Sequence, residues 1–181
     1  VAGNLLVTNA GVLGFGGGAF NKENSLRQLP YSPGNGPVVR IGGDAVVTGN
    51  SELHVFCGTN SLVDGLGAFV DIAGAFVLRG AGNALYPVSH PFTGCSARFR
   101  ARSFALETNS VIDATARGYS GMHGKSTVIG YGPGASLGAS AASYGGRGAA
   151  KTAGEARPTY PTDEESGRQV PVYPGSGSGG N

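Results

Sequence analysis

Val38–Gly49, which reads VVRIGGDAVVTG, recurs along the chain in recognisable form. The stretch Val70–Gly80, VDIAGAFVLRG, matches it with a shift of 31 residues, and isoleucine, glycine and aliphatic side chains fall at corresponding positions. Weaker copies lie 34 residues before the first stretch, at Leu5–Leu13, and 29 residues after the second, at Ala101–Leu106. A period of about 20 to 50 residues is typical of stacked architectures, in which one unit buries its apolar face only against a neighbour.

Short strands and corners alternate within one repeat. From Val38 the side chains alternate to a corner at 42–43, a second run reaches a corner at 49–50, and a third ends near Cys57. Three short strands in about 30 residues describe one coil of a three-sided parallel β-helix. Sandwiches and up-and-down barrels are the competing all-β folds, but they need hairpin turns such as Asn-Gly, which none of these corners provides. We therefore predict an all-β, three-sided parallel β-helix, that is, a β-solenoid.

The inward-facing positions follow from the alternation of side chains along each strand. In a solenoid these positions stack from coil to coil in ladders that form one continuous core. We expect this core to contain Val39, Ile41, Val47, Val70, Ile72, Phe76, Leu78, Phe99, Phe104 and Leu106.

The strand pattern ends near residue 117, where the composition changes. We expect residues 1–117 to form the coils, with two inserted loops at 14–37 and 81–95 that are punctuated by proline and glycine. Residues 118–181 lose strand periodicity and form a Gly/Pro/Tyr-rich extension. Because this extension has no core of its own, we expect it to dock on the coils or on a neighbouring copy. The expected anchors are Tyr119, Tyr131, Tyr144, Tyr160 and Tyr173, although their spacing also fits simple scatter.

The composition points away from several classes of protein. Glycine accounts for 34 of 181 residues, and only 13% of the residues are charged, which suits many short strands and tight corners rather than long helices. The net charge of +2, with 13 basic and 11 acidic side chains, is too small to indicate a nucleic-acid surface. The chain starts at Val1 without a basic and apolar leader, which indicates a processed protein or a segment of a longer one.

The state of the two cysteines depends on where the chain is located. Cys57 and Cys95 are not in a CxxC pair; they form one disulfide if the chain is extracellular and are two buried thiols if it is not.

One apolar run could be mistaken for a membrane helix. The run at 66–78 contains Asp71 and is shorter than the roughly 18 apolar residues of a membrane helix, so we expect buried strands and no membrane span.

The glycine-rich half resembles a known kind of protein. Residues Gly130–Gly148 read GYGPGASLGASAASYGGRG, and they are followed by Tyr160-Pro161, Pro171-Val172-Tyr173 and a final PGSGSGGN. This arrangement resembles the glycine-rich segment of very large extracellular β-helix proteins of bacteria and protists, which carry a YGGRGG core and a terminal GSGGG. Ala149-Ala150 and Ser178 depart from that pattern. The resemblance implies an extracellular or cell-surface location and a segment of, or a subunit polymerised into, a long solenoid.

Three arginines form the most conspicuous charged pattern. Arg98, Arg100 and Arg102 alternate with apolar residues, so we expect their guanidinium groups on one outer face, about 7 Å apart. Such a ladder could bind an acidic polysaccharide. The simpler interpretation is a solvated strand face balanced by Asp71 or Glu107 on neighbouring coils.

Nothing in the sequence assembles a catalytic or metal site. Polysaccharide lyases and hydrolases need clustered carboxylates, but Asp44, Asp64, Asp71 and Asp113 are scattered one per coil, and under the 31-residue shift Asp71 aligns with Arg40. The histidines His54, His90 and His123 lack metal-ligand spacing. We expect no catalytic residues, no metal and no cofactor.

These observations favour a structural protein rather than an enzyme. We expect an extracellular β-solenoid segment that assembles with copies of itself, or with adjacent segments of a longer chain, into a filament or surface layer. The alternative is a carbohydrate-binding or polysaccharide-degrading β-helix, with polysaccharide as its partner. Because open solenoid ends expose strand edges, we also expect that deleting Gly118–Asn181 weakens the polymer.

Overall fold

A computed structural model describes residues 1–16, 36–59, 66–91, 93–115 and 117–119. The chain divides into two compact units, which we call the strand unit (Val1–Val88 and Ser96–Thr115) and the second unit (Ser89–Cys95 and Ala116–Asn181). The strand unit contains every strand of the described residues. The expected domain boundary at residue 117 therefore lies just inside the second unit, which also takes in residues 89–95.

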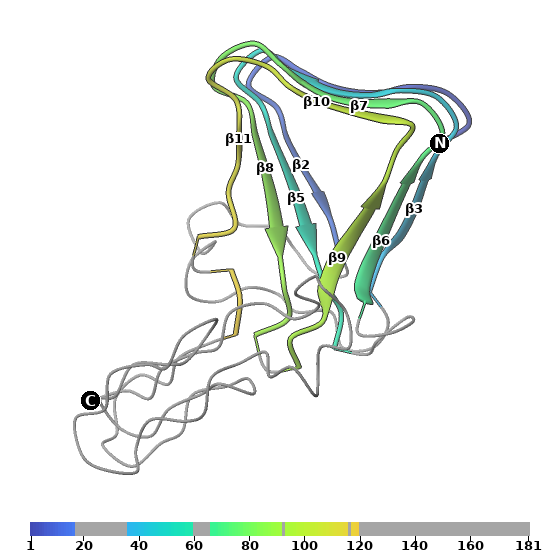
Figure 1. The fold of residues 1–181 in the computed structure, drawn as a ribbon, viewed down its shortest axis with the longest axis vertical. Helices are drawn as coiled ribbons and strands as arrows, with labels where there is room; N and C mark the ends of the chain where they lie inside the picture. Colours follow the sequence, from blue (N-terminus) through green and yellow to red (C-terminus); the bar gives the residue numbers. More distant parts are fainter. Residues whose placement is uncertain (17–35, 60–65, 92, 116, 120–181) are drawn as a thin grey trace, which may run out of the picture. The chain divides into compact units, whose positions relative to one another are not determined.

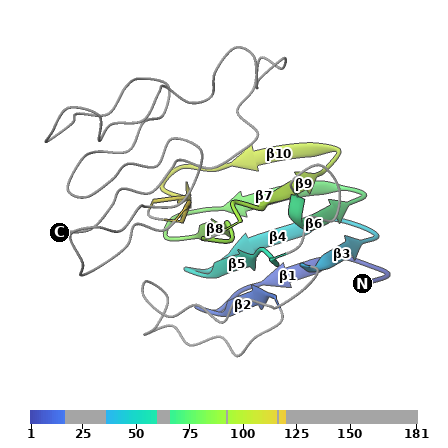
Figure 2. The same ribbon diagram turned by 90° about the horizontal axis from the view of Figure 1, so that it is seen from below.

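The strand unit is all-β, and its strands form three parallel sheets (Figure 1). The sheet orders are β1-β4-β7-β10, β2-β5-β8-β11 and β3-β6-β9, so the chain visits the sheets in rotation. Figure 2 shows the successive passes of the chain lying one above another. The predicted all-β class is confirmed. The strands are β1 (Leu5–Val7), β2 (Val12–Phe15), β3 (Val38–Ile41), β4 (Ala45–Thr48), β5 (Glu52–Phe56), β6 (Leu66–Ile72), β7 (Ala75–Arg79), β8 (Ala84–Val88), β9 (Ser96–Arg100), β10 (Ser103–Leu106) and β11 (Val111–Ile112).

The strand registers test the predicted repeat. Strand β3 pairs with β6 and β4 with β7 at the predicted shift, so that Ile41 lies beside Ile72. Strand β9 pairs with β6 at the expected 29-residue spacing, whereas β10 pairs with β7 one residue closer, with Phe104 beside Phe76. The expected 34-residue shift of the first copy is wrong. Strand β1 pairs with β4 across 40 residues, because residues 17–35 lie between β2 and β3 and lengthen the first repeat.

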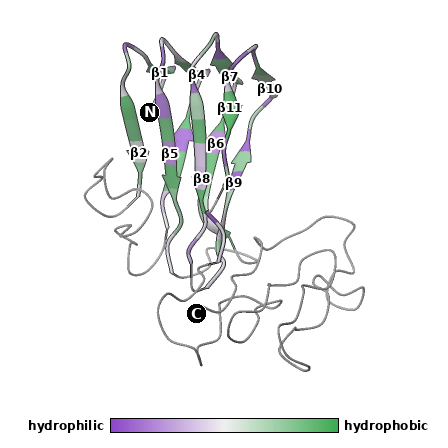
Figure 3. Cartoon of the chain, turned by 90° about the vertical axis from the view of Figure 1, so that its left-hand side faces the viewer, coloured by the Kyte–Doolittle hydropathy of each residue, from purple (hydrophilic) through white to green (hydrophobic). Residues whose placement is uncertain are grey.

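The inward-facing side chains form ladders, as predicted. Six of the expected core residues are at most 3% exposed: Ile41, Val47, Val70, Ile72, Phe76 and Leu78. Phe76 stacks on Phe99 with ring centroids 6.0 Å apart and meets Phe104 edge-on at 4.8 Å. Apolar segments recur along successive strands of the unit (Figure 3).

The expected burial of the last ladder positions is wrong. Phe104 and Leu106 follow the register of Phe76 and Leu78, but they are 48% and 50% exposed. Strand β10 ends its sheet, so nothing in the described residues stacks on these two side chains. At the other positions expected in the core, Val39 and Phe99 are only half-buried.

The inserted loop expected at 81–95 is shorter than predicted, because residues 84–88 form β8. Pro87 suggested that the chain leaves the stack there, since proline lacks an N–H for the ladder. The structure shows why it fits. The carbonyl of Leu85 accepts from the N–H of Asp113, so Leu85, and Pro87 two residues later, face the β11 side. Strand β11 ends at Ile112, and no strand donor is needed at Pro87.

The corners that join the sheet β1-β4-β7-β10 to the sheet β2-β5-β8-β11 share one backbone feature. The backbone has positive φ at equivalent points of the four corners: Ala10 (54°), Asn50 (59°), Gly82 (74°) and Asn109 (61°). Asparagine and glycine adopt this conformation at low cost, which is why these residues mark the corners in the sequence. The corners predicted at 42–43 and 49–50 are confirmed.

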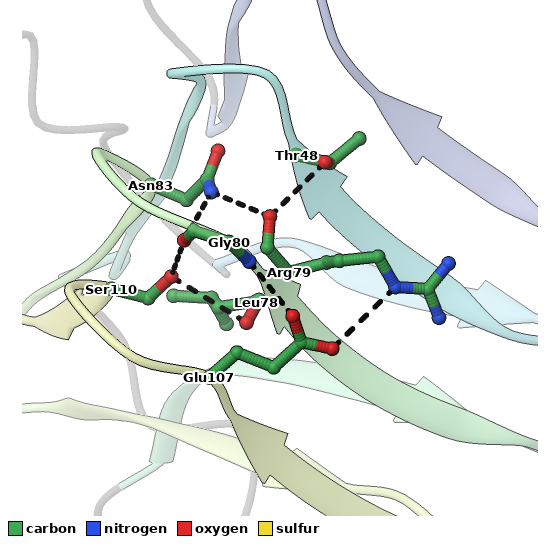
Figure 4. A network of polar contacts seen from close by, with 7 residues as sticks. All are labelled: Thr48, Leu78, Arg79, Gly80, Asn83, Glu107 and Ser110. Atoms are coloured by element: carbon green, nitrogen blue, oxygen red, sulfur yellow. Dashed lines mark hydrogen bonds and ion pairs between the residues drawn. The ribbon is translucent and has the colours of Figure 1, made fainter.

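Asn83 stabilises the corner between β7 and β8 (Figure 4). Its side chain is 1% exposed, and its amide nitrogen donates to the carbonyls of Arg79 and Gly80, each at 2.8 Å, and of Ala81 at 3.2 Å. Its amide oxygen accepts from the buried N–H of Ser51, in the corner between β4 and β5, at 3.0 Å. One side chain thus satisfies backbone groups of two neighbouring corners.

Replacing Asn83 with alanine should lower the free energy of unfolding by about 1–3 kcal/mol, because the buried N–H of Ser51 loses its acceptor. The carbonyls of Arg79 and Gly80 keep hydroxyl donors, from Thr48 and Ser110 respectively, and so add little to this loss. Asn109→Gly is the matched control in the corner of the next coil, where Asn109 is exposed and glycine adopts the positive φ without strain; we expect a change within about 0.5 kcal/mol. Urea denaturation followed by circular dichroism measures both. Equal stability of Asn83→Ala and the parent chain would contradict this role.

Candidate functional site

The outward side of the β3-β6-β9 sheet carries two rows of side chains that we call the basic face. The first row is Val38, Phe69 and Arg98, and the second is Arg40, Asp71 and Arg100, each row lying across β3, β6 and β9 in register. Alternation along β6 fixes this orientation, because Val70 and Ile72 are buried in the core at 1% and 3% exposure.

Asp71 holds Arg100 with both carboxylate oxygens. Arg100 Nε donates to Oδ1 at 2.7 Å and Nη2 donates to Oδ2 at 2.6 Å, a bidentate pair that bridges two strands. The hydrogen bond from Arg100 lowers the pKa of Asp71 below its ordinary value of 3.8. The guanidinium carbon of Arg100 also lies 5.3 Å from the centre of the Phe69 ring. The expected balancing of the arginines by Asp71 is thus present for Arg100.

The other arginines of the basic face differ from Arg100. Arg98 and Arg40 are exposed, and no carboxylate lies at ion-pair distance from either among the described residues. Arg40 acts on Asp71 only through longer-range attraction. Arg102 lies in the bend after β9, where its backbone N–H donates to Gly74, so strand alternation does not place its side chain with the other two as expected. The predicted arginine ladder did not include Arg40. Its alignment with Asp71 under the 31-residue shift was the sequence signal that places it on this face.

The remaining described carboxylates mostly serve the backbone. Asp44 Oδ1 accepts from the N–H of Ala75 at 2.8 Å, and Asp113 Oδ1 accepts from the N–H of Thr115 at 2.8 Å. Glu107 accepts from the N–H of Gly80 at 2.9 Å and lies 3.6 Å from Arg79. Each of these carboxylates therefore has a local structural role.

A cluster formed by Glu52 and His54 of β5 and Tyr86 of β8 was not predicted from the sequence. His54 is 3% exposed although it alternates with inward-facing Leu53 and Val55, and its Nε2 lies 2.9 Å from Glu52 Oε2. Tyr86 of β8 packs against its ring at 4.5 Å. A 32-residue shift between β5 and β8 places His54 beside Tyr86, and recognising this shift in the sequence would have predicted their contact. No group of three or more histidine, cysteine, aspartate or glutamate side chains with metal-binding geometry occurs in the described ranges.

The cysteines and the predicted tyrosine anchors lie partly in the second unit. Cys57, in the strand unit, and Cys95, in the second unit, are both buried thiols here, and the disulfide of a secreted chain stays a prediction. Within the second unit, the Tyr119 hydroxyl donates to the Thr93 carbonyl at 3.3 Å, and the Thr93 N–H donates to His90 Nδ1. Burial lowers the pKa of His90. The other expected anchors lie outside the described residues: Tyr131, Tyr144, Tyr160 and Tyr173.

Among the described residues, the strand unit also has two open sides, where no further strand pairs with the terminal strands of the sheets. Strands β1 and β2 end their sheets at one side, and β10 and β11 end them at the other. Large apolar side chains are exposed at both sides: Leu6 and Val12 at the first, and Phe104, Leu106, Val111 and Ile112 at the second. Exposed apolar strand edges are sites where further strands add.

Comparison with known proteins gives no relative to this chain. No family model, curated protein or solved structure matches it. The described part of the chain contains no helix with the length and hydrophobicity that a membrane span requires.

The Asp71–Arg100 pair predicts a defined pH dependence. Because the pKa of Asp71 is lowered in the folded chain, its contribution to stability is complete above the ordinary value of 3.8 and is lost as the pH falls through the folded-state pKa. Asp71→Asn should therefore be less stable than the parent chain at neutral pH, and the difference should shrink below about pH 4. Urea midpoints measured across pH test this. Arg100→Gln should abolish the same pH dependence, and a difference that grows on acidification would contradict the assignment.

Proposed function

We propose that the three sheets form a three-sided parallel β-helix, and that this β-solenoid is an extracellular structural protein that stacks end to end in a filament or surface layer. The rotation of the chain through three parallel sheets supports the helix. The stacking partner is a second copy or, in a longer chain, an adjacent segment. The observation that carries the proposal is the match between the two open sides.

The backbone groups at the first open side follow from the pairing of β1. The N–H of Leu5 donates to the carbonyl of Asp44, so Leu5 and Val7 face β4. Backbone groups of successive residues in a strand point to opposite sides. The N–H and C=O of Leu6 therefore point away from β4, into the open edge.

The backbone groups at the second open side have the complementary phase. The N–H of Glu107 donates to the carbonyl of Leu78, so the N–H and C=O groups of Phe104 and Leu106 point away from β7. If a second copy continued the existing register, Leu6 of its β1 would lie beside Ala105. Its N–H would then reach the carbonyl of Phe104, and its carbonyl would accept from the N–H of Leu106, as parallel pairing requires.

The side chains match in the same register. The existing ladders run from Leu5 through Ala45 and Phe76 to Phe104. A second copy would place its Leu5 over the exposed ring of Phe104. In the neighbouring sheet, Leu13 would cover Ile112, which continues the ladder of Leu53 and Leu85. Stacking would thus bury the half-exposed side chains that the fold leaves at its last coil.

Leu6→Pro tests this assembly. Proline removes only an N–H that points into the open edge, and edge strands tolerate proline, so the fold should persist while stacking weakens. Losing this bond and leaving its acceptor buried should weaken each contact between copies by about 5- to 150-fold. Sedimentation velocity and electron microscopy of the parent chain should show polymers, and the variant should sediment as a monomer.

The control for this experiment is Leu6→Val, which keeps the N–H and a side chain suited to a strand and should still assemble. A parent chain that stays monomeric at all concentrations would overturn the structural function itself. A parent chain and Leu6→Pro variant that polymerise equally well would show that assembly uses another surface.

The enzyme alternative lacks support from the described carboxylates. A retaining or inverting glycosidase needs two carboxyl groups flanking one bond. Asp44 and Asp113 bind backbone N–H groups, and Asp71 binds Arg100. We therefore favour a non-catalytic protein.

A further inference from the structure

We propose that the basic face binds a linear acidic polysaccharide, with Arg98 and Arg40 as the residues that contact its sulfate or carboxylate groups. This binding site is independent of stacking, because it lies on the outer side of the β3-β6-β9 sheet rather than at the strand edges of β1 and β10.

The charge of the face is the first support. Arg40, Arg98 and Arg100 face one carboxylate, Asp71, which leaves an excess of two positive charges on six residues. The whole chain of 181 residues has a net charge of only +2. These six residues alone therefore carry as much net positive charge as the whole chain, and such a local excess attracts anionic ligands.

The geometry of the face favours a linear ligand. Arg40 and Arg98 lie on the two outer strands of the sheet and in adjacent rows, so their Cα atoms are separated by about 10 Å across the strands and about 7 Å along them. With both side chains extended outward, the two guanidinium groups suit a linear chain with acidic groups at regular intervals, because successive groups reach successive arginines.

The Asp71–Arg100 pair occupies the space between these two arginines. Its bidentate geometry holds Arg100 over Phe69 and offers both hydrogen-bond donors and acceptors, which suit the hydroxyl groups of a sugar. Val38, which is 49% exposed, borders Phe69 and offers an apolar contact to the C–H groups of a sugar ring. The face therefore combines charge, hydroxyl partners and apolar surface.

Nucleic acid fits this face less well. Duplex DNA is typically held by about 6–10 phosphate contacts, more than these arginines supply. Single strands bind through bases stacked on open aromatic rings. The one aromatic ring of the face, Phe69, is covered by Arg100. An acidic polysaccharide needs no such ring.

Binding of the full chain to fluorescent dextran sulfate and polygalacturonate, measured by anisotropy at low salt, tests the site. Uncharged dextran is the ligand control. Arg98→Gln and Arg40→Gln should each weaken binding to an acidic polymer by about two- to fivefold, as for a single exposed ion pair, and the double variant should lose more. Arg79→Gln is the matched protein control, since it removes the same charge from β7, outside this sheet, and should leave binding unchanged.

Asp71→Asn provides a second test that a merely structural role could not satisfy. It removes the negative charge and releases Arg100, so it should tighten binding about two- to fivefold although it destabilises the fold. Absence of binding to both acidic polymers would overturn the site, as would equal losses in Arg79→Gln and Arg98→Gln. Preferential binding of duplex DNA or of phosphatidylserine vesicles would instead assign the face to another class of ligand and overturn this one.

Discussion

The structure of the strand unit depends on one constraint: each strand pairs in parallel with the strand one turn of the chain away. Every ladder hydrogen bond therefore joins residues about 30 to 40 positions apart, as between the N–H of Glu107 and the carbonyl of Leu78 or between the N–H of Leu5 and the carbonyl of Asp44. Such pairings are costly in loop-closure entropy and are recovered only when neighbouring turns form together. The corners matter for this reason, since a change in corner length would shift every following strand out of register.

The corner between β7 and β8 shows how the chain absorbs such a change. Its segment contains one residue more than the equivalent corner between β4 and β5, yet the strands on both sides keep their ladders. Asn83 accommodates the extra residue because its side chain binds the carbonyls of Arg79, Gly80 and Ala81. Gly82 supplies the positive φ at the point where Asn50 supplies it in the preceding turn. Polar side chains thus stabilise the corners, and apolar side chains stabilise the strands.

Much of this arrangement could be predicted from the sequence, and the exceptions have physical causes. The 31-residue match placed β3, β4, β6 and β7 correctly because β3 pairs with β6 and β4 with β7 at this shift, and buried apolar residues lie side by side in both pairs. The first repeat was misplaced because its length includes residues 17–35, which carry no strand pattern. Strand β8 was missed because Pro87 signals a break, and which way its backbone faces cannot be deduced without the partner strand. Of the basic face, the alignment of Arg40 with Asp71 was visible, but the bidentate contact of Asp71 with Arg100 depends on side-chain geometry.

The open sides proposed for stacking and the basic face proposed for polysaccharide binding point in different directions. Stacking adds strands to the open edges, whereas the basic face points outward, across the direction of stacking. If copies stack in the existing register, the face therefore stays accessible and recurs along the polymer at each copy. An acidic polysaccharide that contacts one face would then meet the next at a short, fixed distance, and such multivalent contact raises overall affinity without any new interaction. The low affinity expected of exposed arginines in one copy is thus compatible with firm attachment of an assembled filament, because the number of faces, rather than the strength of each, determines the avidity.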